Sequence, residues 1–125
     1  MPVVFQKFIT RQDIKNNPQN LYVFGDNLQR AGLGGQAKEM RGEKNSVGLP
    51  TKKSPSPTGF LSNDDFDEVL EASEEDEKRL IAHLKSGGVV IWPEDGIGTG
   101  LAQLRDHAPA IFEFYTNLLE EFKGL

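Results

Sequence analysis

In the stretch Val89-Val90-Ile91-Trp92-Pro93-Glu94-Asp95-Gly96-Ile97-Gly98-Thr99-Gly100, a short apolar run leads directly into a glycine-rich turn. The segment Leu21-Tyr22-Val23-Phe24-Gly25-Asp26-Asn27 repeats this pattern, and more glycines follow it at Gly32, Gly34 and Gly35. Each stretch predicts a strand, then a flexible loop, then the start of a helix. Such a loop directs backbone N–H groups and a helix dipole at one place, which suits a phosphate group. Two loops of this kind could hold the two ends of a diphosphate, so the sequence predicts a nucleotide-binding α/β domain.

Composition limits the class of protein. The chain has 125 residues, of which 37% are hydrophobic and 26% charged, and this is typical of a single globular domain over residues 1–125. Its net charge of −5 disfavours binding to nucleic-acid backbones, which requires a basic surface, but permits a small anion held by backbone amides. The absence of cysteine excludes disulfides, cysteine-ligated zinc and a catalytic thiolate. We expect a cytoplasmic protein without a membrane partner, because the N-terminus lacks a signal pattern and no apolar run approaches the length of a membrane span.

Strand and helix signals alternate along the chain, which predicts a compact three-layer α/β sandwich around a mixed sheet. The last helix has the clearest signal, because Pro109 suits its first turn and an apolar stripe of helical period follows. Ser73 is expected to cap an earlier helix, since acidic residues follow it in the pattern of a capping box. The segment 51–59, with two prolines and two lysines, predicts an exposed flap. Strands are expected within residues 1–9, 21–24, 46–50 and 89–92.

Three motifs occur in an order that is typical of a known family. The first is Phe24-Gly25-Asp26-Asn27 with Gly32-Leu33-Gly34-Gly35-Gln36-Ala37, the second is Asn45-Ser46-Val47-Gly48-Leu49-Pro50-Thr51-Lys52, and the third is Asp95-Gly96-Ile97-Gly98-Thr99-Gly100. The set resembles the macro domains, in which an asparagine at a strand end leads into a glycine-rich loop and a later Gly-Ile-x-Thr-Gly turn holds the diphosphate of ADP-ribose. The middle motif resembles the Ile-Pro-Thr-Lys segment of small macro-like proteins of bacteria and phages. The resemblance covers residues 21–52 and 88–110, and it implies a macro-like fold that binds an ADP-ribose-like nucleotide and leaves its hydrolysis open.

Two other interpretations stay open. Residues 93–99 are similar to the Pro-Gly-Gly-x-Gly-Thr loop of lysine-decarboxylase-like nucleotide phosphoribohydrolases, which implies a nucleotide-binding protein of the Rossmann type. The chain departs from that loop at Glu94, which replaces its first glycine, and at Gly100, which stands in place of the family's catalytic glutamate. The other interpretation is a non-catalytic interaction domain, in which the glycine loops are structural and the acidic surface contacts a protein partner.

The candidate site residues come from these motifs. The resemblance implies that Asn27 contacts a ribose, and Asp26 and Asp95 could orient a water molecule or bind ribose hydroxyls, so these three are the catalytic candidates. Each also has a structural explanation, because asparagine and aspartate serve turns and helix caps. No cofactor and no metal site is expected, since His83 and His107 lack the spacing of metal ligands. The expected ligand-binding residues are Gly25, Gly32, Gly34, Gly35, Thr51, Lys52, Gly96, Ile97, Gly98, Thr99 and Gly100.

Overall fold

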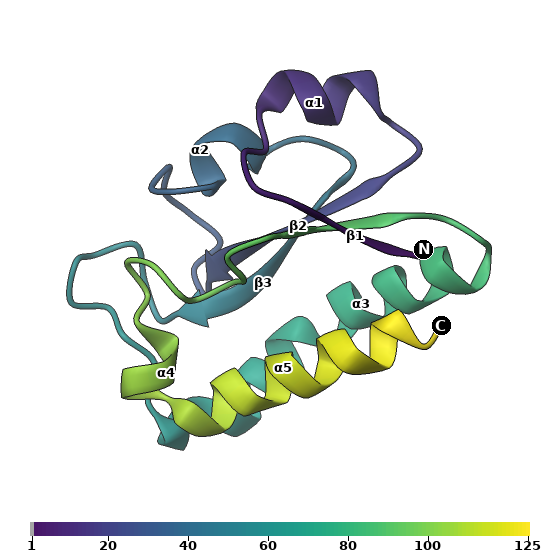
Figure 1. Ribbon diagram of the computed structural model, residues 1–125. Coiled ribbons are helices and arrows are strands. Elements are labelled where there is room, and N and C mark those ends of the chain that lie inside the picture. The colour runs from purple at the N-terminus through teal and green to yellow at the C-terminus, as the bar shows by residue number, and fades with distance from the viewer. Residues whose placement is uncertain (1) are drawn as a thin grey trace.

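A four-stranded sheet forms the middle layer of the protein. The computed structural model describes residues 2–125 (Figure 1). The strand order is β1 (Val3–Gln6), β4 (Val90–Pro93), β2 (Leu21–Asn27) and β3 (Ser46–Lys52), and each neighbouring pair is parallel.

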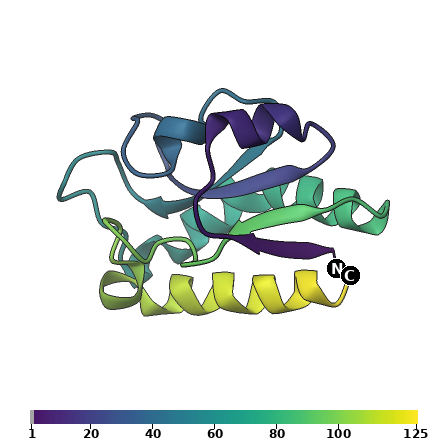
Figure 2. The ribbon, with the colours of Figure 1, turned by 45° about the horizontal axis from the view of Figure 1, so that its top comes forward.

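Helices cover both faces of this sheet. On one face lie α1 (Arg11–Asn16) and α2 (Ala37–Met40), and on the other lie α3 (Phe66–Lys85) and α5 (Pro109–Lys123) (Figures 1 and 2). A short 3₁₀ turn, η1 (Asn63–Asp65), precedes α3, and the one-turn helix α4 (Leu104–His107) precedes α5. The three-layer α/β sandwich predicted from the sequence is therefore confirmed.

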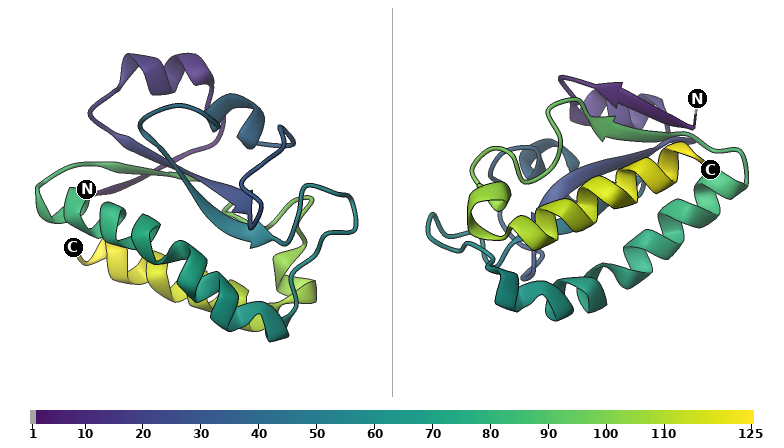
Figure 3. Two further views of the ribbon diagram at one scale, coloured as in Figure 1. Left: turned by 180° about the vertical axis from the view of Figure 1, so that it is seen from behind. Right: turned by 60° about the horizontal axis from the view of Figure 1, so that its bottom comes forward.

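Alternate side chains of the central strands face opposite helical layers. On β2, Leu21 and Val23 belong to the core that contains α3 and α5, whereas Tyr22 and Phe24 belong to the core that contains α1 and α2. Figure 3 shows α3 and α5 side by side under the sheet. Because both faces of the strand are buried, its sequence is a continuous apolar run rather than an alternating one.

The sheet is parallel, whereas the sequence analysis expected a mixed one. The chain crosses a face of the sheet through α1, α2 or α3 between each pair of successive strands. A crossover of this kind returns the chain to the same end of the sheet, so the next strand runs in the same direction. The expectation of a mixed sheet was wrong because strand pattern locates the strands and does not give their pairing.

One helix start differs from the sequence prediction, and one short helix was not predicted. The capping box lies at Ser62, whose backbone N–H donates to Asp65 Oδ2 at 2.8 Å, and α3 begins just after it. Ser73 is consequently buried inside α3, where its Oγ donates to Glu77 Oε2 at 3.2 Å, so the predicted cap at Ser73 is wrong. Helix α1 gave no apolar stripe in the sequence, because Ile14 is its one buried residue.

The predicted apolar stripe of the last helix is confirmed. Pro109 is the first residue of α5, and residues 111, 115, 118 and 122 are buried against the sheet while residues 112 and 119 pack beside them. Among the helices of residues 2–125, none combines the length and the apolar content needed to cross a bilayer.

Candidate functional site

The carboxyl ends of β2 and β4 open a crevice at one edge of the sheet. These strands are neighbours, yet the chain after β2 leads to α2 on one face and the chain after β4 leads to α4 and α5 on the other (Figure 1). Ligands of parallel α/β sheets bind where neighbouring connections diverge in this way. A pocket of about 370 Å³, here called the first pocket, lies at this place.

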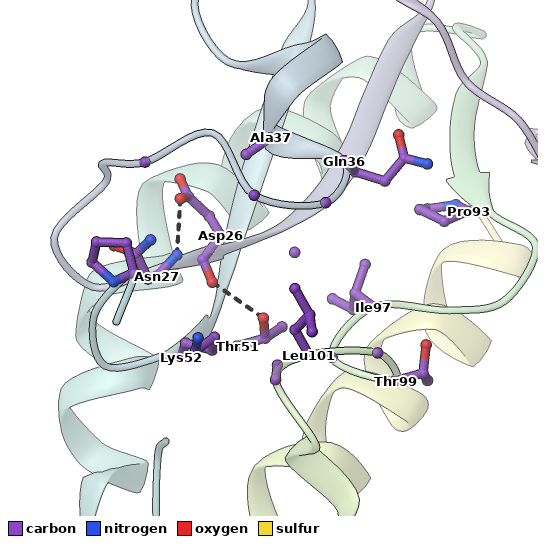
Figure 4. A pocket seen from close by; sticks show the side chains of 18 of the residues that line it. Asp26, Asn27, Gln36, Ala37, Thr51, Lys52, Pro93, Ile97, Thr99 and Leu101 are labelled. Carbon is purple, nitrogen blue, oxygen red and sulfur yellow. Dashed lines mark hydrogen bonds between the residues drawn. The ribbon is translucent and has the colours of Figure 1, made fainter. Parts of the chain in front are cut away.

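Both glycine-rich loops line the first pocket. The loop after β2, the loop after β4 and the end of β3 all contribute to its wall, and every candidate residue taken from the sequence lies along it. Figure 4 shows Asp26 at the end of β2, Thr51 near the end of β3 and Ile97 in the loop after β4 gathered around the same space. The sequence could therefore predict which segments converge.

The backbone of the two loops offers a series of hydrogen-bond donors. Within the part of the chain that the structure describes, the N–H groups of residues 32–36 and 97–102 donate to no protein acceptor. Gly32, Gly35, Gly96 and Gly98 have φ values of 91°, 57°, 86° and 74°, in the left-handed region. Left-handed residues among right-handed ones turn successive N–H groups toward one side, and such concave donor arrays bind anions.

Neither loop leads into a long helix. α2 and α4 have four residues each. The macrodipole of a one-turn helix is small, so the helix dipole contributes little to the attraction for an anion that the sequence predicted. Attraction for an anion comes from the unpaired N–H groups and from nearby side chains.

Asp26 is buried beneath the first loop, and its carboxylate is fully engaged. Arg41 donates to both carboxylate oxygens, with Nη1 at 3.3 Å from Oδ2. Arg30 Nη1 lies 3.5 Å from Oδ2, and the backbone N–H of Asn27 donates to Oδ1 at 2.8 Å. Two guanidinium groups thus neutralise this carboxylate, and the geometry favours a structural role over that of a general base.

The same two arginines hold the first loop in place. Arg41 Nε donates to the carbonyl of Gly32 at 2.7 Å, and its Nη2 donates to the carbonyl of Ala31 at 3.1 Å. Arg30 reaches α3, where its Nη2 lies 2.8 Å from Asp76 Oδ2. The cluster of Asp26 with its two arginines therefore ties the loop to the sheet on one side and to α3 on the other.

Asn27 and Thr51 also form internal hydrogen bonds. Asn27 Nδ2 donates to the carbonyl of Ala31 at 2.7 Å, which stabilises the turn after β2. Thr51 Oγ1 donates to the carbonyl of Asp26 at 3.1 Å and so links β3 to β2 (Figure 4). The structure thus supplies the structural explanation for Asn27, and its contact with a ribose stays a prediction.

Asp95 differs from the other two catalytic candidates. It is exposed at the start of the second loop, and its carboxylate forms no hydrogen bond or ion pair with residues 2–125, although its backbone carbonyl accepts from Thr99 Oγ1 at 2.9 Å. It is the candidate carboxylate that stays available to a ligand.

The pocket also contains residues that the sequence analysis missed. Lys7 lines it from the end of β1, because β1 pairs with β4, and nothing local in the sequence marks this lysine. The side chain of Gln36 points toward Pro93 (Figure 4), and its Oε1 is buried without a protein partner among the described residues. Lys52, which was predicted, donates from Nζ to the carbonyl of Ser56 at 2.7 Å and stays half-exposed.

The glycines of the pocket have different structural roles. A Cβ at Gly98, which has a positive φ, would lie 2.8 Å from the Cβ of Leu104, so this position requires the absence of a side chain. A Cβ at Gly25 would lie 3.1 Å from Thr51 Oγ1, which is a tight contact. A Cβ at Gly34 or Gly100 would meet nothing within 4 Å. The last two glycines therefore test ligand binding without disturbing the packing.

The histidines lie outside the first pocket. The ring of His107 stacks on Phe60 with centroids 3.9 Å apart, and His83 Nε2 lies 3.0 Å from the carbonyl of Val89. Among residues 2–125, no group of three or more histidine, aspartate or glutamate side chains is arranged to hold a metal ion.

Comparison with known proteins places the chain in a family. Residues 4–118 match the family of unknown function DUF7831, and the chain belongs to it. No curated protein matches the chain, and no solved structure matches it either.

Proposed function

We propose that this protein binds a nucleotide of the ADP-ribose type, with the phosphate groups of the ligand in the first pocket. One observation carries the proposal: two runs of backbone N–H groups without protein acceptors converge on a crevice where the connections after β2 and β4 diverge. Concave arrays of backbone N–H groups that have no protein acceptor bind anions, so their concentration at one pocket favours an anionic partner.

The charges around the first pocket support an anionic ligand. Asp26 is neutralised by Arg30 and Arg41, so it does not repel a phosphate from within. Lys7 and Lys52 line the pocket and bring positive charge to a chain whose net charge is −5. A local basic site in an acidic protein suits a small phosphate compound better than a long nucleic acid.

Binding is favoured over hydrolysis by the state of the candidate groups. Asp26 and the side chain of Asn27 are engaged in internal hydrogen bonds, so neither is free to activate a water molecule. Only Asp95, of the three catalytic candidates, has a free carboxylate in the described residues. A hydrolytic step would have to use Asp95 or the ligand's own phosphate.

Calorimetric titration with ADP-ribose, AMP and pyrophosphate tests the proposal. The wild-type protein is expected to bind ADP-ribose, and Gly34→Val and Gly100→Val are expected to lose this binding, because each adds a side chain at the donor loops where space is open. Gly124→Val is the matched control, since Gly124 lies at the end of α5 outside the pocket.

Thermal melts establish that the variants are folded. Absence of binding by the wild-type protein to all three compounds at millimolar concentration would refute the proposal. Unchanged affinity in both pocket variants would assign the glycines to turn geometry alone.

A further inference from the structure

A second pocket of about 200 Å³ lies on the other side of the loop that follows β4. It is formed between the first half of α5 and the ends of β1 and β4. The two pockets share a wall, because both are lined by Pro93, Asp95, Gly96, Ile97 and Thr99. A molecule bound in the first pocket needs only to cross this loop to reach the second.

The second pocket has a different chemical character from the first. Its wall contains four aromatic side chains, and Phe5, which is 43% exposed, stands beside its buried β4 neighbour Trp92. The ring of Tyr115 also lines it, while the Tyr115 hydroxyl donates to the carbonyl of Pro50 at 2.6 Å. An apolar pocket with an exposed aromatic ring at its edge, here that of Phe5, suits a flat apolar group. The remaining lining residues are Glu94, Phe112, Thr116 and Leu119.

Charge separates the two pockets. The charged residues that line the second pocket are Glu94 and Asp95, both acidic, so this pocket repels a phosphate group. Lys123 lies beside Phe5, with its Nζ 5.4 Å from the ring centroid, and is paired with Glu120 at 2.9 Å. The first pocket shares Asp95, but it also has Lys7, Lys52 and the unpaired N–H groups.

We propose that the second pocket receives the aromatic, nucleobase-like end of the same ligand whose phosphates lie in the first pocket. This proposal rests on the proposed function. The ligand then straddles the loop after β4, and Asp95, which lines both pockets, accepts a hydrogen bond from a sugar hydroxyl at the crossing. The orientation follows from charge, because the acidic pocket takes the uncharged ring and the donor-rich pocket takes the anion.

The test uses a substitution that fills the second pocket without touching the first. Thr116 is an exposed residue of α5 that lines the second pocket only, so Thr116→Trp places a large ring there. Asn117→Trp is the control, because Asn117 is the next exposed residue of the helix and lines neither pocket. ADP-ribose and pyrophosphate are titrated calorimetrically into the wild-type protein and both variants, and thermal melts verify folding.

We expect Thr116→Trp to lower the affinity for ADP-ribose at least tenfold and to leave the affinity for pyrophosphate within twofold of the wild-type value. Asn117→Trp is expected to change neither affinity. Wild-type affinity for ADP-ribose in Thr116→Trp would overturn the second-pocket proposal and leave phosphate binding intact. Equal affinity of the wild-type protein for ADP-ribose and pyrophosphate would overturn it as well. Failure of the wild-type protein to bind either compound would instead remove the proposed function, and the second-pocket proposal with it.

Discussion

Replacing Asp26 with asparagine separates a structural carboxylate from a catalytic one. The substitution keeps the size of the side chain but removes the charge that faces Arg41 and Arg30. An amide can still accept a hydrogen bond from the N–H of Asn27, but it cannot satisfy both nitrogens of the Arg41 guanidinium. The side chain of Asp26 is 3% exposed, so water does not compensate for this loss.

The magnitude follows from the contacts that are lost. Charge-assisted hydrogen bonds contribute about 1.5–3 kcal/mol each, and breaking a buried ion pair costs about 3–5 kcal/mol. Arg30 keeps its ion pair with Asp76, so the loss falls mainly on Arg41. We therefore expect Asp26→Asn to lower the free energy of unfolding by about 3 kcal/mol and the melting temperature by roughly 10 °C.

Urea denaturation of the wild-type protein and two variants measures this effect. Asp95→Asn is the matched control, because it makes the same chemical change at an exposed carboxylate of the same pocket, and we expect it to cost less than about 0.5 kcal/mol. The reasoning is refuted if Asp26→Asn unfolds at the same urea concentration as the control. Asp26 would then not be held by the arginines in solution, and its role as a water-activating base would have to be reconsidered.

Three further predictions concern two glycines of the first pocket, Glu77 on α3 and Asp95. Gly98→Ala is expected to lower the free energy of unfolding by about 1–3 kcal/mol in urea denaturation, because the new Cβ would lie 2.8 Å from the Cβ of Leu104 at a residue with a positive φ. Gly34→Ala should cost less than about 0.5 kcal/mol, since its Cβ would meet nothing within 4 Å. Equal stability of the two variants would contradict the packing argument. Burial raises the pKa of Glu77 above its ordinary value of 4.5, and nearby carboxylates raise it further. The folded state therefore binds this proton more tightly than the unfolded chain does, so the free energy of unfolding falls as the pH rises. Glu77→Gln should therefore be more stable than the wild type at pH 7, and this advantage should disappear at pH 4; an advantage that is equal at both pH values would count against the shift. If the protein releases ADP-ribose from modified protein or from its phosphate or acetyl esters, Asp95→Asn should lower the turnover rate far more than the binding affinity. Binding of these substrates without turnover of any of them would define a protein that binds the nucleotide and does not hydrolyse it.

The parts of the fold that the sequence could predict are those with a local signal. The apolar runs at Leu21 and Val90 give β2 and β4, and the stripe that begins at Ile111 gives α5, because burial on a strand or helix face leaves its period in the sequence. The glycine loops after β2 and β4 could also be assigned to one pocket, since both follow strand ends and parallel strands end at the same edge.

The parts that could not be predicted depend on contacts between distant segments. The parallel order of the sheet places β1 next to β4 and so brings Lys7 to the pocket, although the sequence around Lys7 contains no binding motif. The capping box of α3 lies at Ser62, and the alternative at Ser73 fits the same local pattern equally well. Only burial of Ser73 between the helix and its neighbours decides between them.

Asp26 shows why a motif at a strand end is a weak guide to catalysis. Its position after a buried strand and before a glycine loop suits a catalytic carboxylate, and the same position suits a carboxylate that anchors the loop. The two roles differ in the partners of the side chain, and those partners, Arg30 and Arg41, are brought to it by the turn after β2 and by the end of α2. A Cβ at Gly48 on the neighbouring strand would lie 2.5 Å from Asp26 Oδ2, so β3 also leaves room for this carboxylate. Three separate segments are thus adapted to a buried, neutralised Asp26, which is the arrangement expected of a group that positions the glycine-rich loop after β2.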